Sequence, residues 1–241
     1  MTRKFILFIT VLLSIVGCHL TAIPSAELQG NSNQAIAVEM AQNPPESPPI
    51  QVYSPVQERE KLVDIRDINP NIKQDIRYAT TQNFLKRKLY SVPRCLLRAD
   101  VAQSLSKVQQ DLEGMGLGLK VFDCYRPWSV TKQMWEILPD NRYVANPQRG
   151  SRHNRGAAVD LTLVDLRNGK QLEMPTDFDD FTDKAARDYP NNSPQVRRNS
   201  DLLEYKMKQY GFSSLITEWW HFDAVGWNQY SLLDVQLDRV P

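Results

Sequence analysis

The chain has 241 residues, and its 29 lysines and arginines nearly balance its 28 aspartates and glutamates, for a formal net charge of +1. A chain with so little excess positive charge lacks the usual signal of a nucleic-acid-binding protein, so we expect no nucleic-acid partner. Histidine and cysteine each occur only three times, so each can be considered individually.

The first 17 residues predict a secretory signal. A basic start is followed by the apolar run Phe5–Val16, which is too short to favour a membrane span. Residues 15–18 resemble the bacterial lipobox, in which the cysteine becomes lipid-modified and forms the new N-terminus. We therefore expect a lipid on Cys18, with a cysteine placed there by chance as the alternative.

Residues 18–58 predict a disordered tether, because they are rich in Pro, Ser, Gln and Asn and poor in large apolar residues. Residues 59–241 have a suitable length for one folded domain with a single core. The expected arrangement is an exported domain on the periplasmic or cell-surface side, and the lipid anchor would be its only contact with the membrane.

The first half of this domain predicts two short strands, a helix, a longer strand and a second helix. Leu62–Ala79 is broken by a turn at Asn69-Pro70, which indicates a strand, a turn and a short strand. Asp100 can cap a helix with one apolar face that ends at Gly114. The next elements are a strand at Leu117–Tyr125 and a helix at Trp128–Leu138.

The second half begins with a strand at Gly156–Val164, and Asn168-Gly169 after it is a strong hairpin signal. Ser193, with a proline at the first helical position, starts a long helix that ends at Gly211. A single strand is expected at Phe212–Val225. Strands mixed with helices and hairpins, without a repeating βαβ order, predict an α+β fold.

Cys95 and Cys124 are the two cysteines that remain after Cys18. In an exported protein such a pair favours a disulfide, which would brace the strand that leads to Arg126. Two buried thiols are the alternative, because sequence does not reveal the distance that a bond requires.

Two short stretches carry the strongest chemical signal. Ser151–Asp160 contains His153 and ends in a carboxylate, and Glu218–His221 reads Glu-Trp-Trp-His. Two imidazoles and one carboxylate form a typical catalytic zinc set that leaves the fourth position to water. We predict one Zn²⁺ per chain, bound by His153, Asp160 and His221.

Glu218 is the predicted general base, because the chemistry needs a carboxylate that contacts the water without occupying a metal position. Odd spacing in a strand places side chains on opposite faces, so Glu218 and His221 can meet only if the backbone twists or bulges between them. The alternative is that the histidines are hydrogen-bonded core residues and that Trp219 and Trp220 are core aromatics.

Together with Tyr125-Arg126-Pro127, these motifs resemble the VanX-type D-alanyl-D-alanine dipeptidases, zinc enzymes of the same clan as the VanY-type D,D-carboxypeptidases. The matching text is Ser151-x-His153-x-x-Gly156-x-Ala158-x-Asp160 and Glu218-x-Trp220-His221. The resemblance extends from about Leu62 to Trp227. It implies a mainly antiparallel central sheet with helices packed around it.

The resemblance also implies roles for four further residues. Arg126 would stabilise the oxyanion, because a guanidinium keeps its charge and donates in a fixed fork; a solvated or capping arginine is the alternative. Ser151 and Asp179 would bind the charged ends of the substrate, with Asp179 at the ammonium group, unless its acidic segment is a solvated turn. Tyr78 would lie beside the substrate, with ordinary packing as the alternative.

We therefore expect hydrolysis of the D-Ala-D-Ala dipeptide to free D-alanine in cell-wall peptide metabolism, with no protein partner. The alternatives are a D,D-carboxypeptidase that acts on peptidoglycan stem peptides, or a non-catalytic zinc-containing binding module, which would need neither Glu218 nor Arg126. The best-known family members are cytoplasmic, whereas this chain has an export signal, so scavenging of wall fragments is favoured over antibiotic resistance.

Overall fold

The computed structural model describes residues 55–241. The predicted signal at residues 1–17, the predicted lipid-modified Cys18 and almost all of the predicted tether lie outside the described residues. Among the described residues, no helix combines the length and the apolar character needed to cross a membrane.

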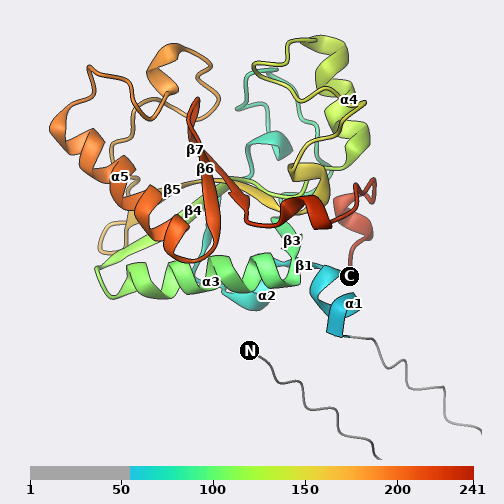
Figure 1. Ribbon diagram of the computed structural model, residues 1–241, viewed down its shortest axis with the longest axis horizontal. Helices are drawn as coiled ribbons and strands as arrows, with labels where there is room; N and C mark the ends of the chain where they lie inside the picture. Colours follow the sequence, from blue (N-terminus) through green and yellow to red (C-terminus); the bar gives the residue numbers. More distant parts are fainter. Residues whose placement is uncertain (1–54) are drawn as a thin grey trace, which may run out of the picture. The chain divides into compact units, whose positions relative to one another are not determined.

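A five-stranded sheet forms the centre of the domain, in the order β2-β4-β5-β7-β6 (Figure 1). Neighbouring strands run antiparallel except for the parallel pair β2 and β4. Its strands are β2 (Lys73–Gln74), β4 (Leu117–Asp123), β5 (Ala158–Asp165), β6 (Phe212–Leu215) and β7 (Glu218–Ala224). A second sheet pairs β1 (Leu62–Asp64) with β3 (Leu96–Arg98). The α+β class with a mainly antiparallel sheet is confirmed.

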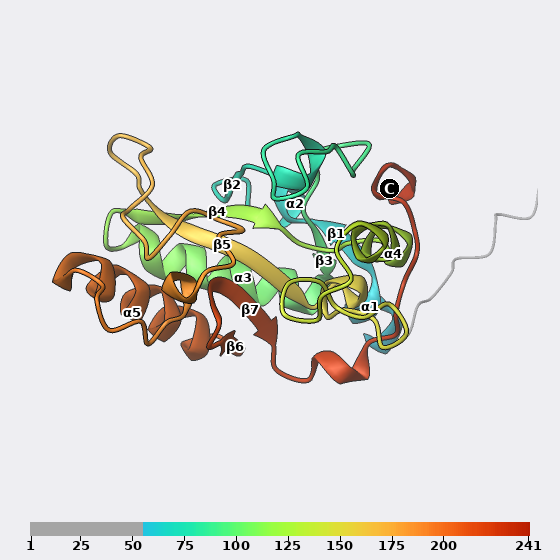
Figure 2. The same ribbon diagram turned by 90° about the horizontal axis from the view of Figure 1, so that it is seen from above.

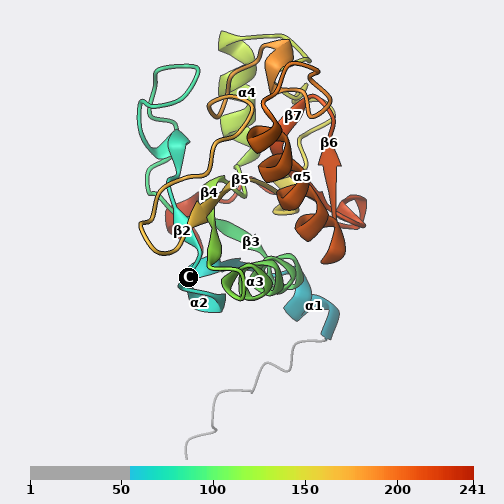
Figure 3. The ribbon, with the colours of Figure 1, turned by 90° about the vertical axis from the view of Figure 1, so that its left-hand side faces the viewer.

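Helices lie on both sides of this sheet. In Figures 1 and 3, α3 lies below the sheet and α4 lies on the opposite side. Helix α3 packs against β4, α5 packs against β6, and the two helices contact each other; Figure 2 shows them from above. The helices are α1 (Pro55–Glu60), α2 (Ile65–Ile68), α3 (Ala99–Glu113), α4 (Trp128–Ile137) and α5 (Pro194–Gln209).

Five short 3₁₀ turns connect these elements in the described part of the chain. They are η1 (Arg77–Ala79), η2 (His153–Arg155), η3 (Asp183–Ala185), η4 (Trp227–Gln229) and η5 (Leu237–Arg239). Four of them, η1 to η4, contribute residues to the wall of the cavity described below.

Strand β5 separates the hydrophobic core from the site. It is buried along almost its whole length, and Val159, Leu161 and Leu163 belong to the main apolar cluster. Successive side chains of a strand point to opposite faces, so Asp160 points away from that cluster. The same alternation that builds the core therefore presents one carboxylate on the other face of the sheet.

Several predicted boundaries agree with the structure. Helix α5 has its N-cap at Ser193, whose hydroxyl accepts a hydrogen bond from the Val196 N–H, and a proline at its first position. Gly211 beyond its end has φ +87°, a left-handed conformation that favours glycine. The predicted turn at Asn168-Gly169 is present, but the strand after it is reduced to a single bridge between Val164 and Gln171.

Four local predictions were wrong. The strand expected before Asn69 ends at Asp64, because the Asp64 carboxylate caps α2 by accepting a hydrogen bond from Arg66 N. Arg77–Ala79 is a 3₁₀ turn, because the chain leaves the sheet after Asp75, whose N–H makes the last bond to Val121 O. Helix α3 begins at Ala99, so Asp100 lies within it, and its carboxylate accepts hydrogen bonds from Val101 N and the Tyr230 hydroxyl.

The fourth wrong prediction concerns the last strand expected in the chain. Phe212–Val225 is a hairpin of β6 and β7 and not one strand. Its turn consists of Ile216 and Thr217, which are β-branched residues without a turn signal.

Candidate active site

A disulfide joins Cys95 to Cys124, with an S–S distance of 1.97 Å. Cys95 immediately precedes β3, and Cys124 immediately follows β4. The carbonyl oxygen of Cys124 lies 2.7 Å from Nδ1 of His153. The predicted bond is therefore present, and one of its two residues directly contacts a predicted metal ligand.

Three adjacent strands present a row of polar side chains on the face away from α3. Asp123 on β4 pairs with Asp160 on β5, and Asp160 pairs with His221 on β7. Residues directly opposite in adjacent strands have neighbouring side chains. The register of the sheet therefore brings together three groups that are far apart in the sequence.

His153 reaches this row from the turn η2, which ends at Gly156. Gly156 has φ +67°, and an added Cβ would lie 2.7 Å from Cδ2 of Leu62. A side chain at this position would be strained and crowded. The glycine therefore permits the tight turn that carries His153 next to β5.

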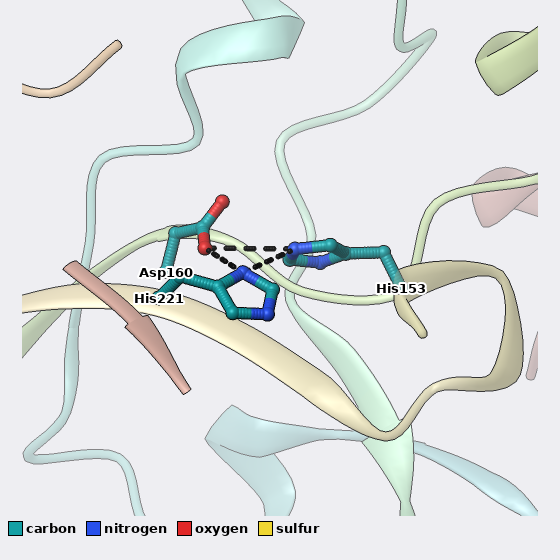
Figure 4. Close-up of side chains that lie close together, drawn as sticks. All are labelled: His153, Asp160 and His221. Carbon is teal, nitrogen blue, oxygen red and sulfur yellow. Dashed lines mark hydrogen bonds and ion pairs between the residues drawn. The ribbon is translucent and has the colours of Figure 1, made fainter. Parts of the chain in front are cut away.

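The three predicted ligands offer one atom each, and these atoms lie within 4.8 Å of one another (Figure 4). Nδ1 of His221 is 3.0 Å from Oδ1 of Asp160 and 3.3 Å from Nε2 of His153. Nε2 of His153 is 3.5 Å from the same carboxylate oxygen. All three residues are buried, so the donor atoms converge on one small, enclosed space.

The remaining ring nitrogens are occupied by other groups, which orients both imidazoles. Nδ1 of His153 donates to the carbonyl of Cys124, and Nε2 of His221 lies 2.9 Å from Oδ1 of Asp223. Asp223 in turn pairs with Arg152 at 3.3 Å. Hydrogen bonds of this kind select the tautomer of a metal-binding histidine and increase its basicity. One histidine therefore presents Nε2 and the other presents Nδ1.

Glu218 lies beside the cluster, with Oε2 4.0 Å from Nδ1 of His221. The pairing of β6 with β7 is irregular here, because Ser214 is opposite Phe222 whereas Leu215 is opposite Glu218. The bulge that the spacing required is thus present. Burial raises the pKa of Glu218, and a raised pKa favours a carboxylate that accepts and returns protons.

Arg126 lies at the end of β4, where Asp123 holds it. Its Nε and Nη2 donate to Oδ2 of Asp123 at 3.1 and 2.6 Å, and its guanidinium lies 5.0 Å from the centre of the Tyr78 ring. Its backbone N–H donates to the carbonyl of His153 at 3.1 Å. This arrangement holds a permanent positive charge next to the three-ligand cluster.

Asp179 has only part of its hydrogen-bonding capacity satisfied. The Tyr78 hydroxyl donates to Oδ1 at 3.1 Å, whereas the buried Oδ2 has no hydrogen-bond partner. Its backbone has φ +64°, which is uncommon outside glycine. Burial and the nearby Asp160 raise the pKa of Asp179 well above its ordinary value. A buried oxygen without a donor is a ready acceptor for a ligand.

The three predicted ligands line one cavity of about 700 Å³ together with Glu218, Arg126 and Asp179. Ser151 is also in its wall, and its Oγ accepts a hydrogen bond from the N–H of His153 at 3.1 Å. Every site residue predicted within the described part of the chain borders this cavity, apart from the two cysteines of the disulfide: Tyr78, Arg126, Ser151, His153, Asp160, Asp179, Glu218 and His221.

Sequence reasoning missed two carboxylates, Asp123 and Asp223. Both are buried, and each holds a predicted functional residue in place. The signal was available, because each is a charged residue next to large apolar residues of a strand, Val121-Phe122 and Phe222, and such residues are seldom buried without a partner. The identity of each partner was not apparent from the sequence, because it depends on strand register.

Comparisons with known proteins point to the same kind of enzyme as the residues of the site. The D-Ala-D-Ala dipeptidase from Escherichia coli K12 is 35% identical over 173 residues, which cover 72% of this chain and 89% of that protein. The dipeptidase of the same name from Enterococcus faecium is 31% identical over 177 residues, with 65% and 87% covered.

Among solved structures, the vancomycin-resistance D,D-dipeptidase VanXYg with a D-Ala-D-Ala phosphinate analogue is 20% identical, with a TM-score of 0.36. This match covers 68% of the present chain and 67% of the VanXYg chain. VanYB in complex with D-alanine-D-alanine is 14% identical, with a TM-score of 0.37 and 56% and 75% covered. Residues 58–236 match the peptidase family described as D-Ala-D-Ala dipeptidase. The chain therefore belongs to the D-Ala-D-Ala dipeptidase family of peptidases.

Proposed function

We propose that this protein is a zinc-dependent hydrolase of the D-Ala-D-Ala dipeptide. The observation that carries the proposal is the convergence of His153, Asp160 and His221 within 4.8 Å, with Glu218 and Arg126 on the wall of the same cavity. A binding module that uses metal only for structure would need neither a base nor a buried arginine there. Relatives up to 35% identical carry the name of this activity.

The donor set fits a single zinc ion. Two imidazole nitrogens and one carboxylate oxygen are a common catalytic combination for zinc. The outer hydrogen bonds from His153 to Cys124 O and between His221 and Asp223 complete the kind of support that such ligands need. We infer one Zn²⁺ per chain, bound through Nε2 of His153, a carboxylate oxygen of Asp160 and Nδ1 of His221.

A bound zinc ion would lower the pKa of a water and polarise the substrate carbonyl. Glu218 would accept the proton of the attacking water and transfer it to the leaving amine, a role that its burial and raised pKa favour. Arg126 would donate to the oxyanion, and Asp123 holds it in position for this.

The two charged ends of the dipeptide find complementary groups in the same cavity. Oδ2 of Asp179 is the buried acceptor without a partner, and we propose that it receives the substrate ammonium group beside the Tyr78 ring. Ser151 Oγ accepts a bond from His153 N, so its hydroxyl can still donate. We place the substrate carboxylate at this hydroxyl.

The size of the cavity favours a second candidate substrate class. A volume of about 700 Å³ lies within the range of ~300–1,000 Å³ found for drug-sized ligands and exceeds what two alanine residues fill. A D,D-carboxypeptidase that acts on longer stem peptides would use this space. Released D-alanine measured with D-Ala-D-Ala and with N-acetyl-D-Ala-D-Ala distinguishes the two activities.

The decisive experiment tests whether Glu218 is the general base and His221 a metal ligand. Glu218→Ala should abolish turnover of D-Ala-D-Ala while one zinc per chain remains, whereas His221→Ala should lose both. Glu136→Ala, at an exposed glutamate on α4, is the matched control and should retain both. If metal analysis showed zinc missing from Glu218→Ala, the assigned roles would be wrong.

We also propose that the protein acts outside the cytoplasm, attached through a lipid on Cys18. The predicted signal at residues 1–17 supports this, and so does the Cys95–Cys124 disulfide, since such bonds persist mainly in oxidising compartments. The unaltered protein should partition with membranes, and Cys18→Ser should release it or block its processing. Recovery of the unaltered protein in the soluble fraction with a free Cys18 thiol would refute the anchor.

A further inference from the structure

The β6–β7 hairpin contains a large irregularity that the catalytic proposal depends on. Between the pairs Ser214–Phe222 and Leu215–Glu218, β6 advances by one residue while β7 advances by four. Such a bulge interrupts the ladder of hydrogen bonds between strands. Buried carbonyl groups at the interruption need donors from elsewhere in the protein.

A single arginine supplies several of these donors. Arg187 donates from Nε to Leu215 O at 3.0 Å and from Nη2 to Trp219 O at 2.5 Å. Its backbone N–H donates to Ile216 O at 2.9 Å. The same residue thus binds both strands of the hairpin and the turn between them.

The surroundings of Arg187 hold its guanidinium in one place. The group lies 4.5 Å from the centre of the Phe222 ring, and burial lowers its pKa to about 10. Glu204 and Asp201 oppose this lowering through their charges, but the buried Nη1 of Arg187 has no hydrogen-bond partner. Burying a charged group is costly unless its donors are satisfied, so the bonds of Arg187 to the hairpin carbonyls are important for its stability in this position.

Arg187 follows η3 in the sequence, and its N–H bond to Ile216 O places it next to the turn where β7 begins. The cavity wall includes Ala186, Leu215 and Glu218, whereas Arg187 does not border the cavity. An effect of Arg187 on the reaction is therefore indirect and acts through the hairpin that it contacts.

We propose that Arg187 is a positioning residue that holds the β7 bulge and thereby sets Glu218 and His221 at the separation the reaction needs. This inference rests on the proposed function and adds a residue to it. The planar fork of an arginine can serve two carbonyls at fixed angles, whereas a lysine offers a single, strongly hydrated point charge. Lysine should therefore not replace it.

The test compares Arg187→Lys with Arg94→Lys. Arg94 also donates to backbone carbonyls, those of Leu237, Val240 and Pro241, but it is outside the cavity wall. A misplacement of about 1 Å can cost about 10²-fold in rate. We expect kcat of Arg187→Lys on D-Ala-D-Ala to fall by about 10- to 100-fold, with KM nearly unchanged and one zinc retained. Arg94→Lys should keep the unaltered kcat.

Amide hydrogen exchange supplies a readout that does not depend on activity. In Arg187→Lys the amides of β6 and β7 should exchange faster than in the unaltered protein, whereas those of α3 should not. Wild-type kcat in Arg187→Lys, or equal losses of kcat in both lysine variants, would overturn the proposal. If Arg187→Lys does not fold, Arg187→Gln, which buries no charge, takes its place with the same readouts.

The exchange measurement also separates this inference from the proposed function. An unaltered protein that binds zinc but does not cleave D-Ala-D-Ala would refute the proposed function. Faster exchange confined to the hairpin would still support Arg187 as the residue that holds the bulge, and unchanged exchange would refute it.

Discussion

Two aspartates in different regions of the domain show how the protein treats a carboxylate that supports the fold and one that faces the cavity. Asp64, at the end of β1, accepts hydrogen bonds from Arg66 at 2.7 Å and from Arg94 at 2.8 Å. Burial alone would raise its pKa, but the two arginines outweigh burial and lower the pKa to about 2. Asp179 has one tyrosine hydroxyl and a buried oxygen without a partner, and its pKa is raised.

The difference shows that this fold tolerates an unpaired buried carboxylate oxygen at the cavity but not in a part that serves only stability. A buried carboxylate that serves stability is surrounded by cations, because an unpaired buried charge is expensive. Asp179 retains an unsatisfied oxygen and a left-handed backbone, and such strain concentrates at functional sites. A cationic ligand would complete the set of partners that the protein itself leaves incomplete.

Among the substitutions that test the difference between Asp179 and Asp64, Asp179→Asn should have the largest effect on activity. Truncating one partner of a desolvated charge pair costs about 2–5 kcal/mol, or roughly thirtyfold to several thousandfold in binding. We expect kcat/KM for D-Ala-D-Ala to fall within this range, while activity on N-acetyl-D-Ala-D-Ala, poor from the start, changes little. Steady-state kinetics on both substrates provide the check. Comparable efficiency of the unaltered enzyme on the two substrates would favour the carboxypeptidase.

Asp64→Asn should have the opposite profile. The substitution removes a charged acceptor from two arginines, and hydrogen bonds to charged groups contribute about 1.5–3 kcal/mol each at most. The free energy of unfolding in urea should fall by about 1–3 kcal/mol, and kcat/KM should remain within about twofold, a change of ~0.4 kcal/mol. A large loss of activity at unchanged stability would show that the two regions are not separate in function.

The pH dependence of stability should have opposite signs at the two positions. The pKa of Asp64 is lowered from 3.8 to about 2, so its contribution is complete above its unfolded value and is lost as pH falls toward 2. The stability difference between the unaltered protein and Asp64→Asn should therefore shrink below about pH 4.

The pKa of Asp179 is raised, so ionisation in the metal-free protein opposes folding as pH rises above the unfolded value. Asp179→Asn should consequently stabilise the metal-free protein at neutral pH and not in acid. Urea unfolding of metal-free samples across this pH range tests both signs. A lower stability of Asp179→Asn at neutral pH would contradict the comparison.

The smallest expected effect is that of Tyr78→Phe, which removes the hydroxyl that binds Oδ1 of Asp179. A single hydrogen bond contributes about 0.5–1.5 kcal/mol, so KM for D-Ala-D-Ala should rise by about two- to tenfold. Tyr210→Phe removes a similar bond to Asp111 between α5 and α3 and should leave KM unchanged. Equal effects of the two substitutions would mean that Tyr78 acts only through general stability.

Local patterns predicted much of this fold. Helix α5 begins after Ser193 as expected, because a cap and its neighbouring proline act over a few residues. The hairpin at Ile216 was missed because its turn lacks the residues that mark most turns. The bulge before His221 was required by the spacing of Glu218, although its stabilisation by Arg187 was not anticipated.

By itself, the sequence determined the types of group available and the class of fold. Two histidines, an aspartate and a glutamate in short motifs point to zinc chemistry, because ligand preference is a property of each side chain. Only the tertiary structure decided which atoms meet. The register of β4, β5 and β7 places Asp123, Asp160 and His221 side by side, and a one-residue shift would turn Asp160 to the opposite face of the sheet. Strand register is a long-range property set by the packing of the whole core.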